Sequence, residues 1–467
     1  MWNGYFSCGY KDRISYFDVF YRSVPDEGGY AIAAGLQQVV EYIQGLHYTD
    51  ADIEYLRSRE LFCEEFLEYL RSFRFTGDIW AVPEGTPVFP NVPIMTVRAP
   101  AIEAQMIETF VLLCINHQSL IATKASRIVR AAEGRPVLEF GSRRAQGVGA
   151  AVVGARAAYI GGCVGTACTA SDQLFGVKAA GTMAHSWVQM FDDEYEAFEA
   201  YCRIYPNNAT LLVDTYDSLG SGVPNAIRAF DKVLKPLGIT ECGIRFDSGD
   251  MAYLSRRARE MLDKAGWTGC KITCSNSLDE FLIADLLRQE AQIDVFGVGE
   301  RLITARSEPV FGGVYKLVAV EKPDGTVVPR IKISENLTKI TNPGFKKVYR
   351  IYDAKGMALA DYLCLPEETV DGSEPITLFD PNAVWKRQTV TDYTAVEILK
   401  PIYRGGELVY ELPRLEDIRD YCARQLETLW PEVKRFDNPH IYYVDLSTKL
   451  WELKNKLLMN GGKSIGE

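Results

Sequence analysis

The feature that most constrains this chain is an alternation of short apolar strands with amphipathic helices between about residues 110 and 325. Helical stretches such as 223–237 and 251–266 separate the strands. Consecutive strand–helix units of about 30 residues each form a parallel sheet with helices around it. Six stretches are predicted to be strands: 137–143, 179–186, 210–216, 241–250, 270–276 and 293–299.

Six units in succession favour an irregular, TIM-like α/β barrel over an open doubly wound sheet. In such a barrel the carboxyl ends of all strands meet at one face, which is where barrel enzymes hold their active sites. Chemically distinctive residues occur where each expected strand ends: Arg143, His185, Asp214, Asp247, Asn276 and Gly299. We therefore expect these residues to gather at one face.

The two ends of the chain have a different pattern. Proline-punctuated extended runs over 78–100 predict an antiparallel sheet, and apolar spacing predicts a helix over 31–46. Thr49 is the expected N-cap of a second helix. Short strands and two helices are expected after residue 325. We predict a barrel domain over 111–324 and a second α+β domain built from 1–110 and 325–467.

Charge and cysteine content exclude several classes of protein. With 51 Lys and Arg against 62 Asp and Glu, the net charge is −11, which disfavours a nucleic-acid partner or an anionic membrane surface. An anionic small substrate needs only a few local cations. The 11 cysteines show no Cys-x-x-Cys spacing, so neither a zinc ribbon nor a disulfide framework is indicated. With no visible signal peptide or membrane span, a cytoplasmic location is expected.

Two kinds of arginine stand out at the expected strand ends. Arg143 and Arg144 follow a strand directly, and guanidinium groups bind carboxylates and phosphates. A single arginine there would be expected to form a surface ion pair with Glu139 or a similar residue, whereas two at one strand end favour a functional role. Arg245 lies inside an apolar strand and therefore needs an anionic partner. That partner is either a ligand or a nearby carboxylate, Asp247 or Asp214, and the spacing leaves both open.

Other strand-end residues have both functional and structural interpretations. Asp247 and Asp250 could hold ribose hydroxyls or a divalent cation, or one of them could cap the following helix. Gly297 and Gly299 could expose backbone amides to a phosphate, although two glycines alone are a weak signal. His185, one of four histidines, lies among small residues where a ligand could reach its ring.

Taken together, these segments resemble the nicotinate phosphoribosyltransferase family over most of the chain. The matching segments are 28–43, 73–91, 139–147, 181–189, 211–227, 243–255, 274–280, 296–299 and 312–318. The resemblance implies a type II phosphoribosyltransferase fold, in which an irregular α/β barrel accompanies a domain built from both termini. It also implies a homodimer with sites at the subunit interface.

The implied reaction joins nicotinate to 5-phosphoribosyl 1-diphosphate, yielding nicotinate mononucleotide and diphosphate, with coupled ATP hydrolysis, in NAD salvage. Mg²⁺ would accompany the diphosphate and ATP, and no metal site held by the protein alone is expected. Carboxylates such as Asp247 suit the positive charge that develops on the ribose, and arginines with Mg²⁺ suit the leaving group.

The resemblance also implies residue roles. His185 matches the histidine that family members phosphorylate from ATP, and Thr182 and Arg245 match nicotinate-binding positions. Arg143 matches an active-site arginine, and Thr304 a position that contacts the phosphoribosyl donor. The expected catalytic residues are His185, Asp247 and Asp250; the expected substrate-binding residues are Arg143, Thr182, Arg245, Asn276, Gly297, Gly299 and Thr304.

Three further features of the sequence bear on substrate binding. Nicotinamide-specific relatives carry an aspartate in the loop matching 165–168, which is neutral here and favours nicotinate. Glu300 follows the glycine pair and would repel a phosphate. The family leader, whose tyrosine stacks on the base, would precede Met1, so we expect either a truncated sequence or altered base binding. The alternatives are a nicotinamide- or quinolinate-type enzyme, or a non-catalytic nucleotide-binding relative.

Overall fold

The computed structural model of the protein describes residues 1–336 and 339–462. The chain forms two compact units, one made of residues 1–120 with those from 310 onwards, the other of Ile121–Pro309. The first unit is built from both ends of the chain, as predicted. The domain boundaries after residues 110 and 324 stay a prediction.

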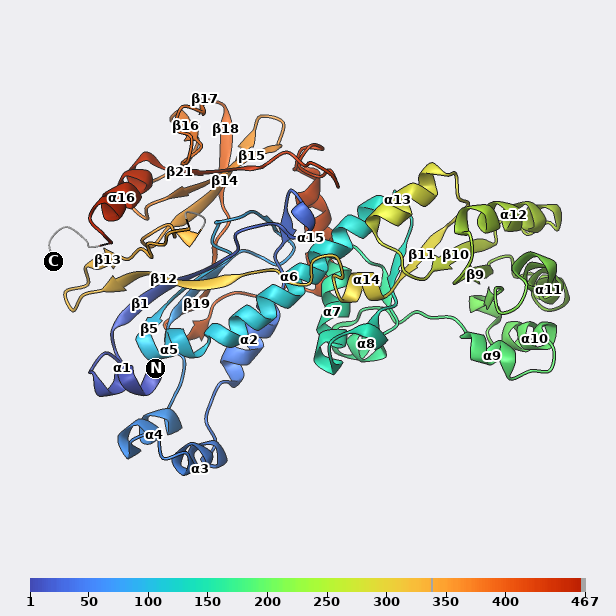
Figure 1. The fold of residues 1–467 in the computed structure, drawn as a ribbon, viewed down its shortest axis with the longest axis horizontal. Coiled ribbons are helices and arrows are strands. Elements are labelled where there is room, and N and C mark those ends of the chain that lie inside the picture. The colour runs from blue at the N-terminus through green and yellow to red at the C-terminus, as the bar shows by residue number, and fades with distance from the viewer. Residues whose placement is uncertain (337–338, 463–467) are drawn as a thin grey trace. The chain divides into compact units, whose positions relative to one another are not determined.

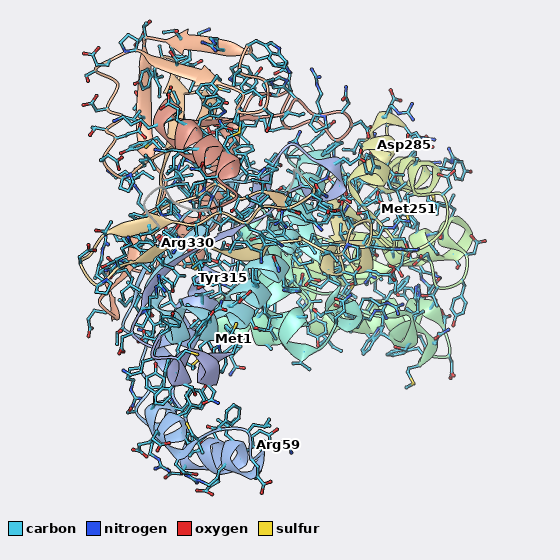
Figure 2. All side chains as sticks on the ribbon, turned by 60° about the vertical axis from the view of Figure 1, so that its left-hand side comes forward. Met1, Arg59, Met251, Asp285, Tyr315 and Arg330 are labelled. Atoms are coloured by element: carbon cyan, nitrogen blue, oxygen red, sulfur yellow. The ribbon has the colours of Figure 1, made fainter. Side chains whose placement is uncertain are left out.

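The first unit contains a seven-stranded sheet in the order β13-β12-β1-β5-β3-β19-β20, whose strand pairs are antiparallel. In it β19, from the C-terminal segment, pairs with β3 from the N-terminal segment. Tyr315 in β12, labelled in Figure 2, stacks on Phe17 in β1, and the ring centroids are 4.7 Å apart. The strands are β1 Ile14–Phe20, β3 Asp78–Ala81, β5 Met95–Pro100, β12 Val314–Glu321, β13 Val327–Pro329, β19 Lys400–Arg404 and β20 Glu407–Leu408.

All four strands of a second sheet in the first unit come from the C-terminal segment, and their order is β18-β14-β15-β21. Its buried ion pair, Arg350 Nε to Asp361 Oδ1 at 2.7 Å, joins β14 to β15. The strands are β14 Lys347–Asp353, β15 Ala358–Cys364, β18 Tyr393–Glu397 and β21 Tyr443–Leu446; two smaller ladders join β2 Ala31–Ile32 to β4 Pro87–Val88 and β16 Ile376–Phe379 to β17 Arg387–Val390.

Helices of the first unit largely follow the predicted pattern. Thr49 caps α3 in a capping box with Asp52, as expected. The helix expected over 31–46 begins later, because Gly35 has φ 101° and its Cα lies against the Cys114 backbone, where a Cβ would be 2.5 Å from the carbonyl oxygen. The helices are α1 Trp2–Ser7, α2 Leu36–Gly45, α3 Asp50–Ser58, α4 Glu64–Arg71, α5 Ala101–Met106, α15 Leu415–Glu427 and α16 Thr448–Met459; α6 Glu108–Ala131 continues into the second unit.

The second unit is built on a six-stranded parallel sheet in the order β7-β6-β11-β10-β9-β8. The last strand, β11, pairs with the first, β6, which is the neighbour relationship of a barrel. The seam of this cyclic order lies between β7 and β8, and closure there stays a prediction. The strands are β6 Val137–Glu139, β7 Gly165–Thr166, β8 Thr210–Leu212, β9 Gly243–Phe246, β10 Lys271–Ser275 and β11 Val295–Val298.

One predicted strand of this unit is wrong. Over 179–186 only Ala179 makes a bridge, parallel to Thr166, and the chain then enters a loop that leads to α9. Alanine and glycine are poor strand formers, and the short β7 takes the expected place beside β6. The loop instead carries Thr182 toward β9, as the hydrogen bond described below shows.

The helices of the second unit follow its strands, and Figure 1 shows α10, α11 and α12 side by side along the sheet. Aspartate side chains cap three of them, because the carboxylates of Asp193, Asp250 and Asp279 accept backbone N–H bonds. The helices are α7 Val148–Ile160, α8 Thr169–Phe175, α9 His185–Gln189, α10 Glu194–Ile204, α11 Val223–Ala229, α12 Met251–Lys264, α13 Glu280–Arg288 and α14 Glu300–Ile303. In the described part of the chain, no helix is both long and apolar enough to span a membrane.

Candidate active site

The ends of β9 and β10 form a hydrogen-bonded cluster around the guanidinium of Arg245. Its Nε donates to Ser275 Oγ and its Nη1 to Thr182 Oγ1, each at 2.8 Å. Its Nη2 lies 3.0 Å from Asp247 Oδ1, which also accepts from Ser275 Oγ at 2.5 Å. The carboxylate partner of Arg245 is therefore Asp247 rather than Asp214, and Thr182 joins the same group.

Asp214, at the end of β8, supports the turn that follows β9. Its side chain is buried, and Oδ2 accepts from the Asp247 amide at 2.8 Å and from Ser248 Oγ at 2.7 Å. Its Oδ1 has no hydrogen-bond partner among the described residues. The sequence predicted Asp214 at a strand end. In the structure one oxygen of its carboxylate, Oδ1, can still accept a hydrogen bond or bind a cation.

His185 is the first residue of α9 and is held beside the end of β8. Its Nδ1 lies 3.1 Å from the hydroxyl of Thr215, the residue after Asp214. This contact leaves Nε2 as the ring nitrogen that a ligand could meet. The predicted sites His185 and Asp247 are thus both connected to the segment 214–215.

Arg143 and Arg144 lie in a 3₁₀ turn, Ser142–Arg144, which follows β6 after Phe140 and Gly141. Arg143 is exposed, and no described residue forms an ion pair or hydrogen bond with its guanidinium. Glu300 lies between two cations, with Oε2 3.9 Å from Arg144 Nε and Oε1 3.2 Å from Arg306 Nη1. These arginines partly offset the repulsion that Glu300 was expected to exert on a phosphate.

Three of the predicted site residues have structural hydrogen bonds of their own. Asp250 caps α12 by accepting from the Tyr253 amide at 3.0 Å, and Thr304 donates to the Glu300 carbonyl at 2.7 Å. Asn276 has a left-handed backbone with φ 86°, and its Oδ1 accepts from the Ser277 hydroxyl at 3.1 Å. Their roles in catalysis or substrate binding stay predictions.

The predicted glycine pair lies against Phe140. A Cβ on Gly297 would be 2.6 Å from the Phe140 ring, and one on Gly299 would be 3.3 Å from the Phe140 carbonyl oxygen. The same ring lies beneath Arg245, whose Cζ is 5.8 Å from the ring centroid. The absence of a side chain at Gly297 therefore leaves the space that the ring under Arg245 occupies.

The N-terminal domain model of nicotinate phosphoribosyltransferase matches residues 1–116, and the C-terminal domain model matches 345–454. The nicotinate phosphoribosyltransferase of Bacillus subtilis (strain 168) is 45% identical over 453 residues, which cover 96% of this chain and 91% of the relative. The Caenorhabditis elegans enzyme is 32% identical over 514 residues, 97% of this chain and 90% of its own.

The chain belongs to the nicotinate phosphoribosyltransferase family. Its fold is similar to the crystal structure of human nicotinic acid phosphoribosyltransferase, with a TM-score of 0.84 and 28% identity, and the match covers 98% of each chain. The mixed α/β architecture with a parallel sheet, predicted from the strand–helix alternation, is confirmed.

A buried glutamate that the sequence did not single out adjoins the loop over 165–168, which the resemblance led us to expect to be neutral. Glu139, at the end of β6, accepts from Thr166 Oγ1 at 2.6 Å and from the Gly141 amide. Burial raises the pKa of the Glu139 carboxyl, and these hydrogen bonds oppose the rise. The loop over 165–168 contains no aspartate, as its sequence shows. It nevertheless contacts a carboxylate, because the Thr166 hydroxyl donates a hydrogen bond to Glu139.

The strand ends suit a Mg²⁺ ion that arrives with a substrate. Among the described residues, no three His, Cys, Asp or Glu side chains lie close enough together to hold a metal ion. Mg²⁺ commonly takes one or two carboxylates together with phosphate oxygens and water. The unpartnered Oδ1 of Asp214 is an oxygen ligand of this kind.

Proposed function

We propose that this protein is a nicotinate phosphoribosyltransferase that joins nicotinate to 5-phosphoribosyl 1-diphosphate, with ATP as co-substrate, in NAD salvage. The observation that carries the proposal is the Arg245 cluster, a largely buried cation with three fixed contacts at the end of a parallel strand. The activity for which its relatives are named, phosphoribosyl transfer to nicotinate, gives that cation its substrate, the carboxylate of nicotinate.

The bond change is a displacement at the anomeric carbon of the donor. The ring nitrogen of nicotinate forms a bond to that carbon, while the carbon–oxygen bond to diphosphate breaks. Positive charge develops on the ribose, and a fixed carboxylate stabilises it. Asp247 is suited to this role because its backbone amide is held by Asp214 and its Oδ1 by Arg245 and Ser275.

The departing diphosphate carries negative charge that cations must stabilise. The guanidinium of Arg143 is exposed at a strand end without a partner among the described residues, and Arg144 and Arg306 lie beside Glu300. Mg²⁺ bound to the diphosphate would neutralise part of this charge, with Asp214 and Asp247 as its protein ligands. Asn276, Gly297, Gly299 and Thr304 complete the proposed substrate-binding set, and Asp250 is the third proposed catalytic residue, after His185 and Asp247.

ATP coupling is proposed to act through His185. Its Nε2 attacks the terminal phosphorus of ATP, a nitrogen–phosphorus bond forms, and the bond to ADP breaks; water later releases phosphate. The Thr215 contact at Nδ1 supports this assignment because it orients the ring and leaves Nε2 to react. We also propose that the protein is a homodimer and that it is cytoplasmic. The 11 free cysteines are consistent with the cytoplasmic location, because thiols stay reduced in that compartment.

The test is an assay of the purified full chain with the phosphoribosyl donor, Mg²⁺ and three bases in parallel, with and without ATP. Nicotinate mononucleotide should form, faster with ATP than without it. Equal turnover of nicotinamide would contradict the assignment of Arg245, and turnover of quinolinate alone would replace the proposed substrate.

A further inference from the structure

The hydroxyl of Ser275 lies between the two charged groups of the candidate site. It accepts from Arg245 Nε at 2.8 Å and lies 2.5 Å from Asp247 Oδ1, whereas the Phe246 carbonyl is 3.4 Å away. A hydroxyl has one proton to donate, so the nearer carboxylate is its acceptor. Ser275 therefore connects Arg245 and Asp247 through both of its hydrogen-bonding functions.

The arrangement divides the donors of Arg245. A guanidinium has five N–H groups, and Ser275, Thr182 and Asp247 each take one. One N–H then remains on Nη1 and one on Nη2. Two N–H groups are as many as the two oxygens of one carboxylate need for a two-point contact. The cation is paired and still able to bind an anion.

The side of Arg245 that carries Nε and Nη2 is the one that a carboxylate would otherwise occupy with both oxygens. Such two-point Arg–carboxylate pairs are the strongest of these contacts. Here Asp247 reaches only Nη2 because the Ser275 hydroxyl takes Nε. Without the hydroxyl, Asp247 could turn both oxygens onto Nε and Nη2 of Arg245. Both oxygens of the carboxylate would then be engaged, and the closer ion pair would leave less of the guanidinium charge for a substrate anion.

The surroundings of Ser275 restrict any other arrangement. Its side chain is 2% exposed, on β10 between β9 and β11. Gly297 is its register partner on β11, and Phe140 lies under the guanidinium. The Phe140 ring therefore lies under the Arg245 guanidinium, and the Ser275 hydroxyl beside Nε restricts where Asp247 can approach it.

We propose that Ser275 is a positioning residue that keeps Asp247 from closing onto Arg245, and so preserves the cation for the carboxylate of an anionic base. This inference rests on the proposed function, because it takes nicotinate as the base. It assigns a specificity role to a residue that contacts the substrate only through Arg245.

The test measures the KM for nicotinate and kcat in four full-length proteins: wild type, Ser275→Ala, Ser275→Thr and Ser255→Ala. Ser275→Ala should raise the KM for nicotinate about tenfold, the size expected for one lost hydrogen bond to a charged group. Ser275→Thr retains the hydroxyl and should stay within about threefold of wild type. Ser255 is the matched control, since it is equally buried and its hydroxyl bonds within α12 and to Gln292.

An unchanged KM for nicotinate in Ser275→Ala would overturn the inference, and so would a Ser275→Thr variant as impaired as Ser275→Ala. If Ser275→Ala does not fold, Ser275→Cys takes its place, because it keeps the shape with a weak donor and should raise KM in the same direction. Failure of the wild type to form nicotinate mononucleotide would instead overturn the proposed function, and the inference with it.

Discussion

His185 Nδ1 and Thr215 Oγ1 lie 3.1 Å apart, and this contact fixes which ring nitrogen of the histidine is left to react. The threonine directly follows Asp214, whose carboxylate holds the turn that contains Asp247. One short segment after β8 thus supports both the proposed phosphoryl acceptor and the proposed ribose-stabilising carboxylate.

His185→Ala should abolish ATP-dependent incorporation of acid-labile phosphate while the fold is retained. Thr215→Val keeps the ring but removes one neutral hydrogen bond, worth about 0.5–1.5 kcal/mol, so the phosphorylation rate should fall about two- to tenfold. Labelled phosphate is measured after incubation with ATP. His47→Ala, at an exposed histidine, is the control, and label that persists in His185→Ala would remove His185 from the role.

Arg245→Ala should raise the KM for nicotinate by about 10- to 150-fold, because a hydrogen bond to a charged group contributes about 1.5–3 kcal/mol. Steady-state kinetics with nicotinate varied at saturating donor checks this. Arg257→Ala is the control, since Arg257 is half exposed in α12 and pairs only with Glu260 among the described residues. A KM unchanged by Arg245→Ala would leave Arg245 as a structural partner of Asp247.

Gly297→Ala should impair activity by displacing Phe140, because the added Cβ would lie 2.6 Å from its ring. Overpacking of this kind costs about 1–3 kcal/mol of folding stability. Urea unfolding and the KM for nicotinate are the measurements. At Gly149 in α7 no heavy atom lies within 4 Å of an added Cβ, so Gly149→Ala should leave both values near wild type; equal behaviour of the two variants would argue against the role of Gly297.

Asp445 predicts a dependence of stability on pH that is separate from catalysis. Burial, with a smaller contribution from Asp380, raises the pKa of this carboxyl in β21 to about 7. The folded chain therefore binds the proton more tightly than the unfolded chain does. The resulting stabilisation is complete below about pH 4 and is lost as the pH rises through about 7.

Asp445→Asn should remove this loss. At pH 8 its free energy of unfolding should exceed that of the wild type by up to about 4 kcal/mol, at about 1.4 kcal/mol per pH unit of pKa difference. Near pH 4 the two proteins should unfold alike. Urea titrations across this range give both values, and parallel pH profiles for the two proteins would contradict the prediction.

The sequence predicted the parts of the fold that follow from periodicity. Alternation predicted five of the six sheet strands, and Thr49 predicted the start of α3. The predicted strand over 179–186 is wrong. Its small residues suggested a strand only because of their place in the alternation, and the strand that pairs with β6 is instead the two-residue β7. So short a strand carries no periodic signal.

For the site, strand-end position selected Asp247 and His185, the apolar strand around it selected Arg245, and the family resemblance added Thr182. Hydrogen bonds join Thr182, Arg245 and Asp247. His185 contacts Thr215, the residue after Asp214, which accepts from the Asp247 amide. Ser275 was missed because a serine in a strand is unremarkable until its two partners are known. Glu139 was missed for the same reason, since its contacts with Thr166 and Gly141 depend on strand pairing.

The most direct measurement of the central claim is the yield of nicotinate mononucleotide when the purified chain is incubated with nicotinate, 5-phosphoribosyl 1-diphosphate, Mg²⁺ and ATP. We expect the mononucleotide and diphosphate in equal amounts, a slower reaction without ATP, and strong loss in Arg245→Ala at low nicotinate. No mononucleotide from the wild type, or equal rates with nicotinamide, would contradict the account.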